Sequence, residues 1–198
     1  MLQFKMLCLI VAFISTHLYI LMKKIYVIAF LALLCNSSFA QVKTTITKSA
    51  ITFKIKNLGL NTSGNFNGLK ADIQFKPADL AGSNIIASID AASVNTDNTM
   101  RDDHLKGADY FDVATYPKIT LKSVSFKHTS GDNYLGSFNV TIKDKTKLVE
   151  VPFTYTEAGN TASFNGSFKI NRSDFGIGGK NMVLSNEATI VVNTEISK

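Results

Sequence analysis

Hydrophobic and polar residues alternate with a period of two along most of the chain after residue 50. Ile51, Phe53 and Ile55, for example, alternate with Thr52, Lys54 and Lys56, which is typical of a β-strand with one apolar and one polar face. The pattern predicts an all-β domain of about eight antiparallel strands that must curl or stack to cover their apolar faces. The runs lie at residues 51–55, 69–75, 85–89, 119–126, 134–142, 149–155, 162–170 and 188–196.

Two kinds of interruption refine this pattern. In the run at 119–126 the apolar positions change from odd numbers to even ones, at Val124 and Phe126. One extra residue would produce that change, so we expect a β-bulge near Lys122 or Ser123. Turn-forming residues predict hairpin connections between runs. They are Asn61–Gly64, Gly82–Asn84, Ser130–Asn133 and Gly159–Asn160.

The segment Thr96–Ala108 lacks alternation and carries helix-forming features. Thr96 or Asp97 is suited to cap the N-terminus, and an acidic residue there is favourable to the helix dipole. Asp97 and Arg101 are spaced for an i,i+4 pair, and Gly107 is a natural end. We therefore expect one short helix between two strands, lying across a mouth of the barrel.

Alternation alone fits two kinds of β-barrel. In a soluble barrel the apolar faces point inward, whereas in an outer-membrane barrel they point to lipid. The chain has no Trp, its Tyr residues do not mark regular strand ends, and the predicted helix interrupts the strand series. These features favour the soluble form, whose interior at about eight strands is either filled or holds one small ligand.

Residues 1–40 are expected to be a leader. Met22-Lys23-Lys24 is a short positive region, Ile25–Leu34 is an apolar run, and Ser38–Ala40 supplies small residues. This order is typical of a secretory signal peptide cleaved before Gln41. The folded domain is therefore expected at residues 41–198, in the periplasm or secreted.

Three alternatives concern the leader. Translation starting at Met22 would explain the additional apolar stretch Leu7–Met22, but Leu7–Leu34 also exceeds the roughly 20 apolar residues that a membrane span needs. Acylation of Cys35 would add a lipid anchor.

Removal of the leader takes Lys5, Lys23 and Lys24, which leaves 18 basic and 15 acidic residues and a net charge of +3. That charge gives no support for a nucleic-acid partner.

Several motifs resemble those of the YceI family of bacterial polyisoprenoid-binding proteins. They are Arg101–Leu105, then Gly107–Asp112 with Tyr116-Pro117, and later Arg172–Ile177. Tyr110 replaces a more usual Phe. The similarity extends over residues 41–198, and it implies an extended eight-stranded antiparallel, lipocalin-like barrel with a tunnel for an isoprenoid chain. It also implies a periplasmic location and is compatible with a homodimer.

The inward apolar face predicts the lining of such a tunnel. A space walled by Phe and aliphatic side chains would stay dry and select hydrocarbon, although each such residue, taken alone, is a core-packing residue by default. The candidates for lipid contact are Phe53, Ile55, Ile73, Phe75, Ile89, Leu121, Phe138, Val140, Phe153, Phe164 and Phe168.

The polar motif residues are assigned structural roles. Arg101 and Arg172 are expected to pair with carboxylates from Asp102, Asp103 or Asp174 and so hold the helix and a late loop over the barrel. A second interpretation places His104 or an arginine against a ligand head group. No residues have the spacing of a catalytic or metal site, so we expect neither.

These observations favour a carrier, store or scavenger of one long apolar lipid, a polyisoprenoid or an isoprenoid quinone, without catalysis and without a cofactor. Transient contact with a membrane is a further expectation. The alternative is a filled barrel that acts through its outer surface as a periplasmic stress-response or envelope adaptor.

Overall fold

The computed structural model describes Lys23 and residues 44–179 and 182–197. The chain divides into two units, Met1–Gln41 and Val42–Lys198. The predicted cleavage before Gln41, the alternative start at Met22 and the acylation of Cys35 lie outside the described residues. Within the described part, no helix is both long and apolar enough to cross a bilayer.

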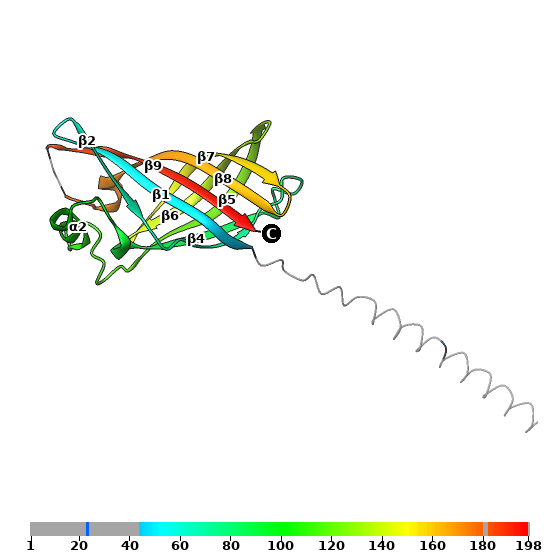
Figure 1. Cartoon of the computed structure of the whole chain (residues 1–198), viewed down its shortest axis with the longest axis horizontal. Helices are drawn as coiled ribbons and strands as arrows, with labels where there is room; N and C mark the ends of the chain where they lie inside the picture. Colours follow the sequence, from blue (N-terminus) through cyan, green and yellow to red (C-terminus); the bar gives the residue numbers. More distant parts are fainter. Residues whose placement is uncertain (1–22, 24–43, 180–181, 198) are drawn as a thin grey trace, which may run out of the picture. The chain divides into compact units, whose positions relative to one another are not determined.

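Nine strands make up one antiparallel sheet, with a short α-helix and two 3₁₀-helices inserted between them. The strand order is β2-β1-β9-β8-β7-β6-β5-β4-β3, and the sheet curls into an elongated half-barrel (Figure 1). The elements are β1 (Thr45–Asn57), β2 (Leu60–Phe66), β3 (Lys70–Gln74), β4 (Asn84–Asp90), η1 (Ala91–Ser93), α2 (Thr99–Lys106), β5 (Lys118–Ser130), β6 (Asn133–Ile142), β7 (Lys145–Ala158), β8 (Thr161–Asn171), η2 (Arg172–Phe175) and β9 (Leu184–Ser197).

Strands β2 and β3 are the two ends of the hydrogen-bonded ladder. Separate contacts join elements near these ends. Asn65 in β2 exchanges two backbone hydrogen bonds with Asn95, at 2.8 and 3.0 Å, and the Thr44 hydroxyl donates to the carbonyl of Ile73 in β3 at 3.2 Å. These contacts satisfy part of the backbone that the unpaired edges would otherwise present.

The all-β antiparallel fold is confirmed, but the prediction of eight strands was one short. The missing strand is β2, because Asn61–Gly64 was interpreted as a turn and instead pairs with β1. The connection is the two-residue turn Leu58-Gly59, with φ values of 51° and 78°. Polar edge strands such as β2 give no alternation, so the pattern of hydrophobic residues could not reveal it.

The β-bulge predicted near Lys122 or Ser123 is confirmed. Ser123 pairs with Phe138 and Ser125 with Ser137, so Val124 is the extra residue between them. Its side chain is exposed. The bulge returns Phe126 to the inner face, where it packs against Phe138 with ring centroids 5.6 Å apart.

Helix α2 lies at one end of the half-barrel, as the sequence predicts (Figure 1). The predicted cap was wrong, because Asn98 is the N-cap and accepts from the Arg101 backbone N–H. Asp97 instead adopts φ 57°, which ends the preceding segment before the helix begins. Gly107 closes the helix as predicted, and its N–H donates to the carbonyl of His104.

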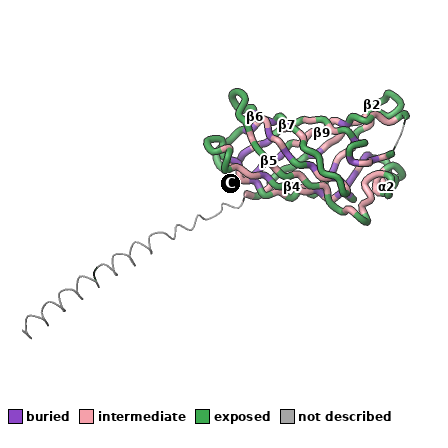
Figure 2. The backbone as a smooth tube through the Cα atoms, turned by 180° about the vertical axis from the view of Figure 1, so that it is seen from behind, coloured by how far each residue is buried: buried purple, intermediate pink, exposed green. Residues whose placement is uncertain are grey.

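Buried residues recur along the strands, while the turns are exposed (Figure 2). Strand β6 shows the reason, since its even-numbered residues from Tyr134 to Ile142 are all buried. Successive side chains of a strand point to opposite faces. The buried positions of the curled sheet therefore converge on one interior.

Candidate lipid-binding cavity

The curled sheet encloses a cavity of about 630 Å³. Every strand contributes side chains to its wall, and most of them are apolar. Met100 of α2, which is highly exposed, and exposed Asn57 at the end of β1 also line it. Because α2 and the end of β1 lie at the same end of the half-barrel (Figure 1), the cavity opens there. We call this end the mouth.

The opposite end is filled by an aromatic cluster. Phe75 lies at its centre and contacts five other rings edge to face, with centroids 4.8–5.6 Å away. These rings belong to Phe126, Tyr134, Phe153, Tyr155 and Phe164. Only Phe153 and Phe164 of this group also line the cavity, so the cluster forms its floor.

The structure places ten of the eleven candidate lipid-contact residues at the cavity wall. They are Phe53, Ile55, Ile73, Ile89, Leu121, Phe138, Val140, Phe153, Phe164 and Phe168. Phe75 is the exception. It lies on the inner face, as its position in the alternation requires, but beyond the floor, where it packs against the two floor residues.

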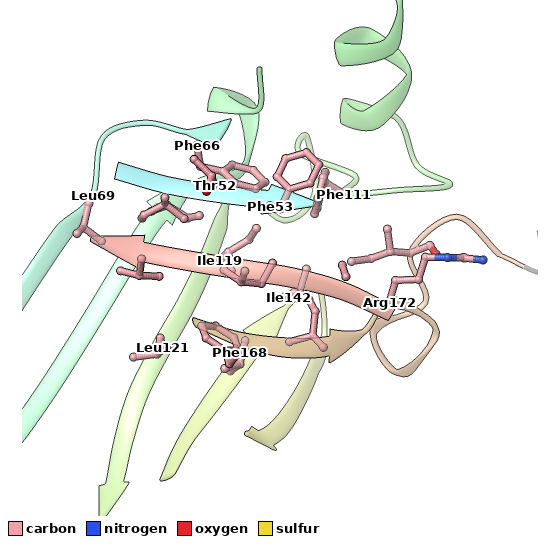
Figure 3. A pocket seen from close by; sticks show the side chains of 18 of the residues that line it. Thr52, Phe53, Phe66, Leu69, Phe111, Ile119, Leu121, Ile142, Phe168 and Arg172 are labelled. Atoms are coloured by element: carbon pink, nitrogen blue, oxygen red, sulfur yellow. The ribbon is translucent and has the colours of Figure 1, made fainter. Parts of the chain in front are cut away.

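A second aromatic group lies nearer the mouth and joins the predicted residue Phe53 to Phe66 and Phe111, which were not among the candidates. The rings of Phe53 and Phe66 are 5.7 Å apart, and those of Phe66 and Phe111 are 5.5 Å apart. Figure 3 shows the three side chains together. Phe66 ends the overlooked strand β2, and Phe111 comes from the connection after α2, so alternation could not indicate either.

Arg101 lines the cavity and anchors α2. Its Nε donates to the Thr96 hydroxyl at 2.8 Å and its Nη2 donates to the Thr96 carbonyl at 2.7 Å. Asp102 accepts from the Thr96 backbone N–H at 2.9 Å and from its hydroxyl at 2.5 Å. Thr96 is buried and therefore holds both charged residues against the segment that pairs with β2.

Arg172 fixes the loop on the other side of the mouth. The side chain is buried and donates to the carbonyls of Ser185 at 2.9 Å, Ile177 at 2.6 Å, Gly179 at 2.9 Å and Leu184 at 3.1 Å. Figure 3 shows its guanidinium directed away from the apolar lining. The fork of N–H donors thus ties η2 to the start of β9.

The carboxylate partners predicted for the two arginines were wrong. The four ion pairs among the described residues do not include Arg101 or Arg172. The hydroxyl and carbonyl oxygen of Thr96 accept from Arg101, and backbone carbonyls accept from Arg172, in place of the predicted carboxylates. Asp103 is exposed and pairs with Lys106 at 3.7 Å. Asp174 is exposed in η2. Neither aspartate lines the cavity.

His104 lies at the mouth and lines the cavity. Its ring contacts Tyr110 edge to face, with centroids 5.0 Å apart. Tyr110 also packs against Gly178, where an added Cβ would lie 2.8 Å from the ring. His104 and Arg101 thus bring ionisable side chains of the lining to the mouth, on α2. No group of side chains suited to a metal ion occurs among residues 44–179 and 182–197.

Two titratable side chains outside the cavity lining, Tyr155 and Asp90, have displaced pKa values. Burial, together with the hydrogen bond that the phenol donates to Glu157, raises the pKa of Tyr155 in the aromatic cluster. The backbone N–H of Ala92 and the ammonium of Lys118 lower the pKa of Asp90, which caps η1. Neither Tyr155 nor Asp90 lines the cavity.

A family model described as a YceI-like domain matches residues 42–196. The chain belongs to the YceI family. The resemblance seen in the sequence is thereby confirmed over nearly all of the described domain.

The chain is also similar to curated bacterial proteins. A UPF0312 protein of Yersinia pestis is 30% identical over 152 residues, covering 73% of this chain and 79% of the relative. A UPF0312 protein of Vibrio cholerae is 26% identical over 149 residues, covering 72% and 79%.

Solved structures share the YceI-like architecture. BcnA of Burkholderia cenocepacia superposes with a TM-score of 0.71 at 30% identity, covering 74% of this chain and 95% of BcnA. A polyisoprenoid-binding domain of Saccharophagus degradans, implicated in plant cell wall breakdown, has a TM-score of 0.64 at 15% identity, covering 79% and 99%. At that identity the second likeness shows the fold alone.

Proposed function

We propose that the protein binds one long apolar lipid in its cavity, as a carrier, store or scavenger, and catalyses no reaction. The observation that carries the proposal is the apolar cavity of about 630 Å³, closed at one end and open at the mouth. This volume falls within the range of roughly 300–1,000 Å³ typical of ligand sites. An apolar cavity excludes water well and suits a hydrocarbon chain.

A polyisoprenoid or an isoprenoid quinone is the ligand class that we favour. Burial contributes about 0.8 kcal/mol for each CH₂ removed from water, so an extended chain needs no charged partner along the wall. A neighbour of the same fold, the Saccharophagus degradans domain, is described as polyisoprenoid-binding. At the mouth, His104 and Arg101 provide the polar groups that a quinone or phosphate head would contact.

We place this activity in the periplasm or outside the cell, on the basis of the leader predicted from the sequence. Fractionation of the native host tests that placement. Recovery of the mature protein in the cytoplasm would contradict it.

Lipid analysis of the natively purified protein tests the binding proposal. Gly166 lines the cavity between Phe164 and Phe168, and an added Cβ would meet its neighbours at ordinary contact distances of 3.4 Å. A bulky side chain in Gly166→Phe should therefore project into the cavity and exclude a ligand. Ser167→Phe is the matched control, because the neighbouring residue is exposed on the outer face.

We expect mass spectrometry to find a stoichiometric isoprenoid with the wild-type protein and Ser167→Phe, and strongly reduced amounts with Gly166→Phe. Repeated isolation of ligand-free wild-type protein that also fails to take up added geranylgeraniol would overturn the proposal. That result would favour an adaptor acting through its outer surface.

A further inference from the structure

We infer that the mouth of the cavity docks on the surface of a lipid bilayer through an apolar rim. The inference extends the proposed function, since a docked mouth would give an apolar ligand a dry route between bilayer and cavity. The rim consists of Leu58 in the β1–β2 turn, Leu60 at the start of β2, Met182 before β9, and Met100 in α2.

The rim contains the most exposed large apolar side chains of the described residues. Leu58 is 72% exposed, Leu60 is 74% exposed, Met100 is 85% exposed and Met182 is fully exposed. Single exposed apolar residues are common on proteins, whereas clustered ones mark interaction sites. The four side chains therefore indicate an interaction site only if they lie close together on the surface.

Backbone contacts bring the rim together. The N–H of Leu58 donates to the carbonyl of Val183 at 2.9 Å, and Asn57 pairs with Leu184 in the ladder. The β1–β2 turn and the segment before β9 therefore form one tip. Figure 1 shows this tip and α2 at the same end of the half-barrel. Asn57, Leu184 and Met100 also line the cavity, so the rim is continuous with the mouth.

The conformation of Leu58 is costly for folding. Leu58 and Gly59 form a two-residue hairpin turn in which both φ values are positive, at 51° and 78°. Asn-Gly is the favoured pair for such a turn, and a leucine pays a steric penalty there. Its exposed side chain recovers little by packing. A residue that costs folding energy without a packing gain is a candidate for function.

The charge of the β1–β2 hairpin suits an anionic bilayer, and several nearby acids have partners: Glu187 pairs with Lys169, Asp103 pairs with Lys106 and Asp102 accepts from Thr96. Lys54 and Lys56 are exposed on β1, and residues 51–71 contain no Asp or Glu. Lysines close to a surface are attracted to anionic lipid heads, while apolar side chains enter the boundary below them. This combination favours a bilayer over a protein partner as the occupant.

The variant L58N/L60T tests the inference without threatening the fold. Asn is favoured at position 58 in this turn, and Thr suits the edge strand at position 60. We expect the thermal midpoint of L58N to equal or exceed that of the wild type. Val124→Thr is the control, because Val124 is an exposed apolar residue in the β5 bulge, away from the rim.

Co-sedimentation with vesicles of phosphatidylethanolamine and phosphatidylglycerol provides the readout. We expect binding to fall by about tenfold or more in L58N/L60T, because two apolar anchors are lost, and to remain unchanged in Val124→Thr. K54Q/K56Q should weaken binding by about fivefold per lysine on these vesicles and have little effect on phosphatidylcholine vesicles. Equal binding of wild type and L58N/L60T, or no binding by either, would overturn the inference.

Two further measurements separate this inference from the proposed function and from self-association. Native mass spectrometry with added geranylgeraniol should find equal uptake by wild type and L58N/L60T, whereas Gly166→Phe should lose uptake but still bind vesicles. Light scattering would reveal a second copy of the chain as the occupant. A wild-type dimer that dissociates in L58N/L60T and ignores vesicles would replace the bilayer with a dimer interface.

Discussion

The two ends of the cavity are built from different chemistry. At the closed end, Phe75 and the five rings around it fill the interior with edge-to-face contacts. At the mouth, Arg101 and Arg172 hold α2 and a loop in place through hydrogen bonds to oxygen atoms, and the large apolar side chains of the rim are exposed.

This difference assigns the stability of the fold to the closed end and access to the cavity to the mouth. Aromatic rings packed in an interior contribute strongly to folding because they bury large apolar areas and interact favourably edge to face. Directional hydrogen bonds fix a loop without filling the space beside it. The mouth can therefore be held open while the floor is solid, and substitutions at the two ends should differ in size and kind.

The largest expected effect is at the floor. Phe75→Ala should reduce the free energy of unfolding by about 3–5 kcal/mol, since it removes a buried ring and leaves a cavity. Urea denaturation monitored by circular dichroism measures this. Met100→Ala at the mouth is the matched control, and we expect a change within about 0.5 kcal/mol because that side chain is exposed. A loss below about 1 kcal/mol for Phe75→Ala would show that the floor is loosely packed.

Arg172→Met should come next, with a loss of about 3 kcal/mol, because the carbonyls that the guanidinium bridges lose a charged donor. The effect should be local, so hydrogen exchange should increase most at residues 177–179 and 182–186. Arg172→Lys keeps the charge but not the fork of donors, and it should recover only part of the loss. Equal stability of Arg172→Met and wild type would mean that the loop is held by other contacts.

The sequence predicted the strands and the inner face well, because burial on one side of a strand imposes a period of two. It placed Phe75 on the correct face but gave no information on depth. Alternation is the same along the whole length of a strand, whereas the point at which rings fill the interior depends on three-dimensional packing. Phe75 and Phe153 therefore looked equivalent, although only Phe153 lines the cavity.

The mouth was less predictable for a different reason. The two arginines at the mouth donate to backbone carbonyls and to the hydroxyl of Thr96. Because every residue has a backbone carbonyl, the sequence does not identify the carbonyls that Arg172 contacts. Carboxylates were the obvious partners for an arginine but were not the ones used. Strand β2 was not predicted because it is polar. The position of Phe66, which ends this strand near the mouth, was therefore not predicted either.

A smaller effect is expected at the start of α2. Asn98→Ala removes the side-chain acceptor for the Arg101 N–H and should cost about 1 kcal/mol, the usual size for an N-cap. Hydrogen exchange in residues 99–103 measures the fraying. The neighbouring Thr99→Ala, which leaves the cap intact, should leave exchange unchanged or slightly slower. Equal fraying in both variants would assign the effect to helix propensity instead of the cap.

The smallest change in stability at neutral pH is expected from a substitution at the closed end. Tyr155→Phe removes one hydrogen bond to Glu157 and should cost about 1 kcal/mol or less. Because the pKa of Tyr155 is raised above its ordinary value of 10.0, the unfolded chain loses the phenolic proton before the folded protein does. The wild type should therefore lose stability as the pH rises above about 10, and the variant should lose less. The stability difference between them should shrink or reverse over that range. A constant difference from pH 7 to pH 11 would show that the phenol ionises as easily in the folded floor as in water, and that the closed end is wetter than its packing indicates.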